Sequence, residues 1–139
     1  MTEKTQYDGD WVIFQAQQAG ESIHSPGAKR VEWNIERHTT ATTYQFTVKV
    51  AANTFVVPAI VVGTPDPNFP RLTRLRVGPF TNMFHKTVHS SWQPMEGLIR
   101  GALDGGIQVM ELKETATPAG PVQELWLQGP GLKIVLRRT

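Results

Sequence analysis

The sequence predicts an α+β protein: a mainly antiparallel β-sheet with one amphipathic helix packed on one side of it. Two observations support this prediction. Several segments alternate apolar and polar residues with a period of two, which is typical of antiparallel strands that lie over a core. One segment, within residues 90–106, changes instead to the period of a helix.

The clearest strands are residues 30–37 and 44–51. Polar and apolar residues alternate along both, so each strand has one polar and one apolar face. The apolar positions are Val31, Trp33, Ile35, Tyr44, Phe46, Val48 and Val50. The connection HTTATT is short enough to join the two strands as a hairpin.

Further strands are expected on both sides of this hairpin, at residues 10–17, 54–62, 71–77, 107–114, 123–129 and 132–139. Residues 54–62 are apolar on both faces. Pro58 within them predicts an edge position or a bulge, because proline lacks the N–H that a sheet ladder uses.

The predicted helix carries a single apolar stripe, formed by Met95, Leu98, Ile99, Ala102 and Leu103. Pro94 suits its first position, Ser90 or Ser91 can cap it, and Gly105 with Gly106 ends it. Gly97 and Gly101 lie four residues apart on the less apolar side. They mark either the close approach of another backbone or a chance spacing.

Length and composition predict a single domain. The chain has 139 residues, of which we expect 1–9 to be a flexible N-terminus and 10–139 the domain. The absence of cysteine excludes disulfides, zinc–thiolate sites and thiol nucleophiles. The longest apolar run, TFVVPAIVVG, has ten residues and contains a proline, which is too short to span a membrane. We therefore expect a soluble protein made in a cytoplasm, with no membrane partner.

No pattern in the chain predicts catalysis. Glu32 and Glu36 share a strand face but would lie roughly 13 Å apart, too far to act on one bond. His85 and His89 have a spacing that two metal ligands on a helix use, but no carboxylate lies near enough to complete such a site, so surface or interface histidines are the preferred interpretation. We expect no enzyme, no metal, no cofactor and no small-molecule substrate.

The strand at 71–77 carries two arginines on one face. Arg74 and Arg76 point the same way, and no acidic residue lies between Asp66 and Glu96. If this strand shares a sheet with the hairpin, their polar side offers Arg30, Asn34, Gln45, Thr47, Lys49, Arg74 and Arg76. Cations contact phosphates, whereas amides and hydroxyls contact bases. The acidic residues Glu32 and Glu36 reduce the positive charge of this face. The competing interpretation is a sheet face that is simply exposed to solvent.

The order of the segments KRVEWNIER, YQFTVKV, LTRLRVGPF and PMEGLIRGALDGG resembles the coat proteins of the small single-stranded RNA bacteriophages. In that family, two adjacent strands are followed by a longer strand that ends near Pro-Phe, and then by a helix with an M-x-G-L-L/I core. The resemblance covers roughly residues 29–106 and depends on the order and spacing of the segments.

The resemblance implies a homodimer with one continuous sheet formed from both subunits, and dimers that assemble into an icosahedral shell, so that the protein would reside in the virion. The inner face of the sheet would bind the single-stranded RNA genome, and also an RNA hairpin through which the protein represses translation. The implied RNA-binding residues are Arg30, Glu32, Asn34, Glu36, Gln45, Thr47, Lys49, Arg74 and Arg76.

The chain departs from the family pattern at both ends. Fewer residues precede the match than in the family, and residues 107–139 predict strands where the family has a second helix. One hypothesis is that a C-terminal strand replaces the missing N-terminal strand in the dimer sheet. Two other classes remain open: a lipocalin-like β-barrel that binds a small ligand, and a non-viral single-stranded nucleic-acid-binding module, which should expose aromatic residues on its basic face.

Overall fold

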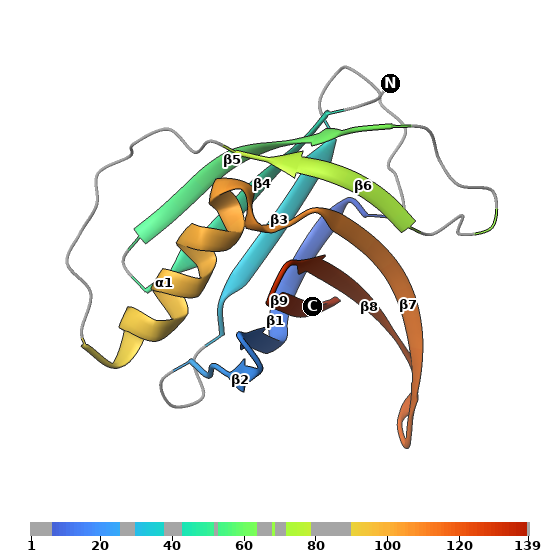
Figure 1. Cartoon of the computed structure of the whole chain (residues 1–139). Coiled ribbons are helices and arrows are strands. Elements are labelled where there is room, and N and C mark those ends of the chain that lie inside the picture. The colour runs from blue at the N-terminus through green and yellow to red at the C-terminus, as the bar shows by residue number, and fades with distance from the viewer. Residues whose placement is uncertain are drawn as a thin grey trace.

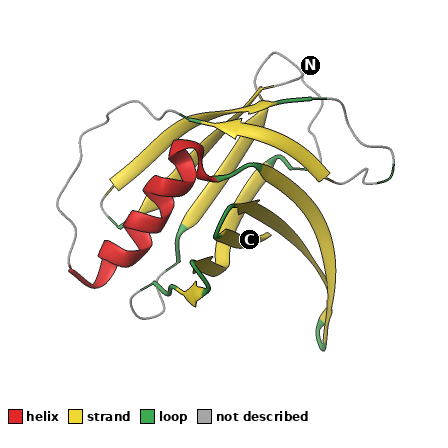
Figure 2. Cartoon of the chain, in the orientation of Figure 1, coloured by secondary structure: helices red, strands yellow, loops and turns green. Residues whose placement is uncertain are grey.

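Strands and one helical segment make up the described part of this computed structural model, which comprises residues 7–25, 30–37, 43–51, 53–63, 68, 72–78 and 90–138. The helical segment packs against a mainly antiparallel sheet, which confirms the predicted α+β class (Figures 1 and 2). No helix in these residues is both long enough and apolar enough to cross a membrane.

The strands are β1 (Gly9–Gln18), β2 (Glu21–Ser22), β3 (Glu32–Arg37), β4 (Thr43–Val50), β5 (Asn53–Val61), β6 (Leu72–Val77), β7 (Val109–Thr117), β8 (Gly120–Gly129) and β9 (Leu132–Arg138). The helical segment consists of a 3-10 turn η1 (Ser90–Trp92), helix α1 (Gln93–Gly101) and a wider turn η2 (Ala102–Gly106). All the predicted strands and the predicted helix are present.

The sheet closes on itself. From β3 to β9, each strand pairs antiparallel with the next, β3 pairs with β1, and β9 pairs back with β1. Within the described residues this ring contains every strand except the short β2, which extends β1. Each strand of the ring has an apolar inner face, and closing the sheet into a barrel buries these faces against one another without leaving a long free edge.

Closure bears directly on the expected dimer. A continuous sheet across two subunits needs a free edge strand in each, but both β1 and β9 already pair within one chain along seven register positions. In the described residues the sheet is therefore completed within one chain and needs no strand from a second subunit, while the homodimer itself stays a prediction. The C-terminal strand does pair with the N-terminal one, but it does so in its own subunit.

The barrel interior contains the predicted apolar face of the hairpin. Trp33, Ile35, Phe46 and Val48 are each at most 1% exposed, and they belong to one core that receives side chains from both halves of the chain. Burying a large apolar side chain contributes about 1.5–3 kcal/mol. The strand phases predicted from the sequence are confirmed here.

The helix adds its apolar stripe to the same core. Its predicted buried residues Met95, Leu98, Ile99, Ala102 and Leu103 are all at most 1% exposed. Pro94 lies in the first turn, and Gly105 ends the segment with a φ of 89°, both as predicted. No side chain caps α1, however, because the 3-10 turn η1 precedes it in place of a serine cap.

The structure decides between the two interpretations of the Gly97 and Gly101 spacing and corrects the edge position expected from Pro58. A Cβ at Gly97 or Gly101 would meet nothing within 4 Å, so their spacing marks no backbone approach. Pro58 lies in β5, which is between β4 and β6 and is not an edge strand. The carbonyl of Pro58 accepts a hydrogen bond from the N–H of Gly78, just beyond the end of β6. The N–H that proline lacks would point to the same side of β5, at the point where the β5–β6 ladder ends.

The N-terminal boundary also lies earlier than predicted. Tyr7 is 4% exposed, its hydroxyl hydrogen-bonds that of Thr73 at 2.9 Å, and its carbonyl accepts the indole N–H of Trp11 at 2.9 Å. Arg138 donates to the carbonyl of Asp8 at 2.7 Å. Residues 7–9 of the segment expected to be flexible therefore belong to the barrel, and residues 1–6 lie outside the described part.

Candidate functional site

The predicted polar face of the hairpin exists on the outer wall of the barrel. Across β3 and β4 the register pairs Glu32 with Lys49, Asn34 with Thr47, and Glu36 with Gln45. Their neighbours Trp33 and Ile35 point into the core, so these six side chains point outward. Arg30 precedes the strand and is exposed. The structure thus brings together seven of the nine predicted RNA-binding residues.

This hairpin face lacks the charge that a phosphate chain requires. It forms a groove of about 420 Å³ lined by Asp10, Trp11, Glu32, Asn34, Thr47 and Lys49. The ammonium of Lys49 lies 4.0 Å from the Glu32 carboxylate, and Asn34 donates to the carboxylate of Asp10 at 2.8 Å. The charged residues that line this groove are thus two carboxylates and one ammonium group, so its lining is not basic as a phosphate-binding groove would be.

Arg74 and Arg76 do not adjoin that face. Strand β5 lies between β4 and β6, and its outward side carries Val56, Pro58 and Ile60. The prediction treated the three polar strands as one surface because the sequence does not show which strand separates them. The nine residues therefore fall into two surfaces, with seven on the hairpin and two on β6.

The two arginines line a groove of their own. It has a volume of about 550 Å³ and is lined by Val62, Arg74, Leu75, Arg76, Val77, Gly105, Ile107, Gln108 and Val109. It forms where the β6–β7 ladder ends, because β7 pairs with β6 only as far as Arg74 and the chain before it turns away into η2. In the part of the chain that the structure describes, neither guanidinium has an ion pair.

From Arg74 at this groove, the register continues as a row of outward residues on β7, β8 and β9. Arg74 lies opposite Val109, Val109 opposite Gln128, and Gln128 opposite Lys133. Residues in one such row share a face of the sheet, so Lys133 lies on the same side of the barrel as Arg74. We call the outward side of β6, β7, β8 and β9 the β6–β9 wall.

An aromatic and cationic cluster occupies the same wall, next to this row. The ammonium groups of Lys113 and Lys133 lie 3.8 and 3.9 Å from the ring centre of Trp126. The Arg137 guanidinium lies 3.5 Å from the ring centre of Phe14, which is 55% exposed. These distances are those of cation–π contacts. The sequence interpretation missed this cluster, although the outward phase of Trp126 in QELWLQG was a signal for it.

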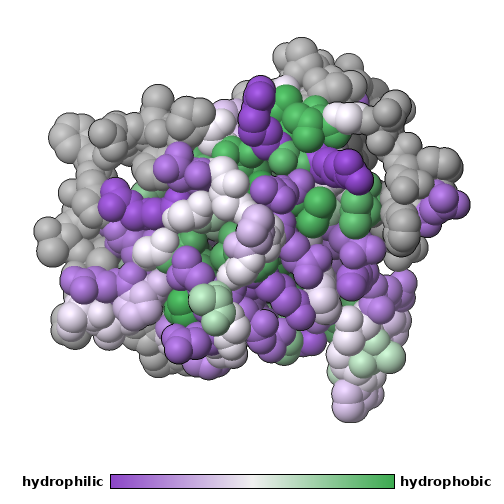
Figure 3. Space-filling view, in the orientation of Figure 1, coloured by the Kyte–Doolittle hydropathy of each residue, from purple (hydrophilic) through white to green (hydrophobic). Residues whose placement is uncertain are grey.

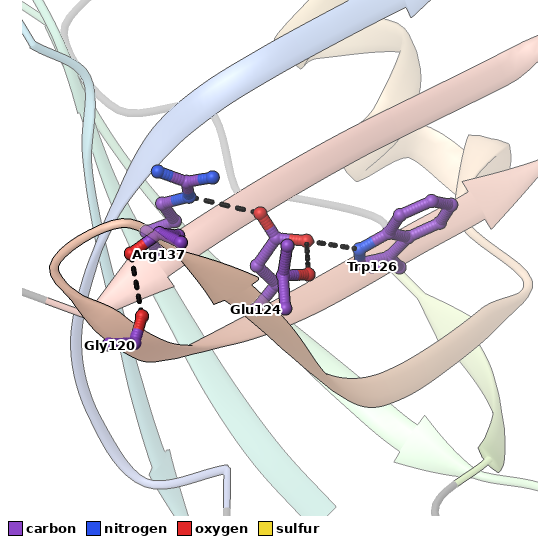
Figure 4. Close-up of polar contacts among 6 residues, drawn as sticks. Gly120, Glu124, Trp126 and Arg137 are labelled. Atoms are coloured by element: carbon purple, nitrogen blue, oxygen red, sulfur yellow. Dashed lines mark hydrogen bonds and ion pairs between the residues drawn. The ribbon is translucent and has the colours of Figure 1, made fainter.

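A buried carboxylate organises the cluster. Glu124 is 4% exposed and accepts hydrogen bonds from the Thr115 hydroxyl at 2.8 Å, the Trp126 indole N–H at 3.1 Å and Arg137 at 3.0 Å. Figure 4 shows Trp126 and Arg137 reaching toward it. Burial raises the pKa of this carboxyl, but the three hydrogen bonds and the Arg137 charge outweigh burial, so its pKa lies below the ordinary value.

The charges of the wall leave three cations without an ion pair in the described structure. Lys113 pairs with Glu111 at 3.6 Å, and Arg137 pairs with Glu124 at 3.0 Å. The three that remain are Arg74, Arg76 and Lys133.

On the face drawn in Figure 3, hydrophobic residues form small separate groups between hydrophilic ones. This face thus presents mixed polar and apolar contacts.

The described inward side chains of the barrel leave no comparable space between them. A cavity wide enough for water would leave part of each lining side chain exposed. The inward side chains of Trp33, Phe46, Met110, Leu125 and Ile134 are all at most 1% exposed. Between these described side chains there is no space for a ligand, in contrast to the lipocalin-like alternative, which needs an internal cavity.

Among the described residues, the remaining candidates form no site. His85 and His89 lie outside the described residues. Within the described ranges, no group of three histidine, aspartate or glutamate side chains lies close enough to hold a metal ion. Comparisons of the chain with protein-family models, with curated proteins and with solved structures found no match.

Proposed function

We propose that the protein binds single-stranded RNA on the β6–β9 wall and catalyses no reaction. The observation that carries this proposal is the pair of guanidiniums of Arg74 and Arg76, which line a groove without an ion pair in the described structure. A cation that is already paired gains little from a phosphate, whereas an unpaired one releases counterions from the nucleic acid when it binds. Arginine also contacts phosphate through two parallel hydrogen bonds.

The spread of the unpaired cations favours a chain over a small anion. Three strand spacings separate Arg74 from Lys133, which is about 14 Å along the wall. A single phosphate or carboxylate reaches only one end of this row, but a chain of several nucleotides reaches both. The wall also carries an aromatic side chain, Trp126, which a duplex with its bases paired inside does not use.

Replacement of both arginines tests the proposal. In Arg74→Gln with Arg76→Gln, affinity for a uridine oligonucleotide should fall at least about tenfold at low salt, and the dependence of log affinity on log salt should become shallower by about 1.4, because two phosphate contacts are lost. The matched control is Arg30→Gln with Lys49→Gln, which removes the same charge from the hairpin face and should change affinity less than about twofold. Fluorescence anisotropy measures both.

If both double variants lost affinity for the oligonucleotide equally, net charge alone would account for RNA binding. That result would contradict the assignment of the RNA site to the groove of Arg74 and Arg76. Wild-type protein without measurable affinity for the oligonucleotide would refute RNA binding itself. Thermal unfolding of each variant, followed by circular dichroism, controls for damage to the barrel.

Assembly into a coat stays a prediction with its own measurement. If the chain is a coat protein, size-exclusion chromatography of the purified protein should show large particles that absorb strongly at 260 nm, since they contain RNA. A single species near 15.5 kDa without nucleic acid would contradict the coat assignment. RNA binding by that monomer would then indicate a non-viral nucleic-acid-binding module.

A further inference from the structure

Trp126 lies on the β6–β9 wall, where its partly exposed ring could contact a nucleic-acid base. We propose that its ring is the stacking site for one base of the bound RNA strand, an inference that rests on the proposed RNA binding. Trp126 lies two residues from Gln128 on β8, so it points to the same side as the row that joins Arg74 to Lys133. A strand whose phosphates follow that row has its bases within reach of the indole.

The ring is held in place before any ligand arrives. Its N–H is bonded to Glu124 at 3.1 Å, and Thr115 and Arg137 fix Glu124 in turn. Burying a carboxylate on an outer wall is costly unless it is fully hydrogen-bonded, and here the hydrogen bonds also define the plane of the ring. A ring with a fixed orientation loses less entropy when a base stacks on it.

The two lysines whose ammonium groups lie over the ring differ in whether an acid pairs with them. Lys113 lies 3.6 Å from Glu111 and is neutralised by it, whereas Lys133 has no ion pair among the described residues. When a base covers the ring, the flexible Lys133 side chain exchanges its contact with the indole for one with the adjacent phosphate. Stacking and charge neutralisation then occur at neighbouring points of one strand, the combination that single-strand binders use.

A matched pair of variants separates stacking from structure. Trp126→Phe and Trp126→Leu both remove the indole N–H and leave Glu124 with one donor fewer, but only phenylalanine keeps an aromatic face. With a uridine oligonucleotide, Trp126→Phe should bind within about threefold of the wild type and Trp126→Leu about tenfold more weakly. With an abasic oligonucleotide of the same length, all three proteins should bind alike, because no base can stack.

The wild-type protein gives an independent readout. The other three tryptophans, Trp11, Trp33 and Trp92, are at most 7% exposed, whereas Trp126 is partly exposed. The uridine oligonucleotide should therefore quench tryptophan emission, and the abasic one should not. This measurement needs no variant and applies even if Trp126→Leu folds poorly.

The outcomes distinguish the two proposals. If the Arg74 and Arg76 double variant loses affinity while Trp126→Leu binds like Trp126→Phe and emission is unchanged, stacking is refuted and RNA binding stands. Stacking is also refuted if Trp126→Leu loses as much affinity for the abasic oligonucleotide as for the uridine oligonucleotide. The ring would then affect binding only by stabilising the fold. Failure of the wild-type protein to bind the uridine oligonucleotide refutes both proposals.

Discussion

Replacement of Gly129 by alanine should destabilise the barrel by about 3 kcal/mol, the upper end of the usual cost of overpacking, because the added methyl group meets main-chain atoms and not the end of a flexible side chain. Gly129 ends β8 where the chain before β7 passes over it, and a Cβ there would overlap the carbonyl oxygen of Gly106. Neither backbone can yield alone. Gly106 belongs to η2, which continues the helix, and Gly129 pairs with Leu132 in the β8–β9 ladder.

Gly97→Ala is the matched control for this substitution. Gly97 lies inside α1, and a methyl group added there would meet nothing within 4 Å, so alanine should stabilise the protein by about 1 kcal/mol through helix propensity alone. Urea unfolding followed by circular dichroism measures both changes. A Gly129→Ala protein with wild-type stability would mean that the helical segment does not sit against the end of β8 as described.

Removal of the Glu124 side chain is expected to have the second large effect. Glu124→Ala leaves the Thr115 hydroxyl, the Trp126 N–H and Arg137 without their common acceptor, which should cost about 3 kcal/mol at neutral pH. Glu124→Gln keeps the shape and one carbonyl oxygen but loses the charge, and should cost about 2 kcal/mol. The free energy of unfolding in urea measures both.

The same carboxylate should make stability depend on pH. Its pKa is lowered in the folded state, because the hydrogen bonds and the Arg137 charge outweigh the opposing effect of burial. Its contribution is therefore complete above the unfolded-state pKa of about 4.3 and is lost as the pH falls through the lower folded-state pKa. The advantage of the wild type over Glu124→Gln should shrink as the pH is lowered from about 5.5 toward 3.

The exposed carboxylate of Glu114, on the same β7–β8 hairpin, provides the control for this profile. Glu114→Gln should leave the pH dependence of unfolding as in the wild type, because the side chain has no ion pair in the described structure. If the wild type and Glu124→Gln lost stability in parallel across the acid range, Glu124 would not be the group responsible.

Local sequence patterns were sufficient to predict the secondary-structure elements and which of their faces are buried. Trp33 and Ile35 enter the core while Glu32 and Asn34 face outward, as their alternation predicts, and the helix buries Met95 and its apolar stripe. These properties are local: the period of the side chains along one segment records which of them leave water.

Which of these faces lie next to one another depends on how the strands are arranged in the folded barrel. The insertion of β5 separates Arg74 and Arg76 from the hairpin, and the closure of β1 on β9 places Val12 opposite Arg137. A shift of register between Ile13 and Gln15 accompanies Phe14, which lies beneath Arg137. Register between segments more than a hundred residues apart depends on how all the strands close together, and no local pattern encodes it. For that reason the sequence predicted a basic strand, and only the folded barrel placed Trp126 and Lys133 on the same wall as its arginines.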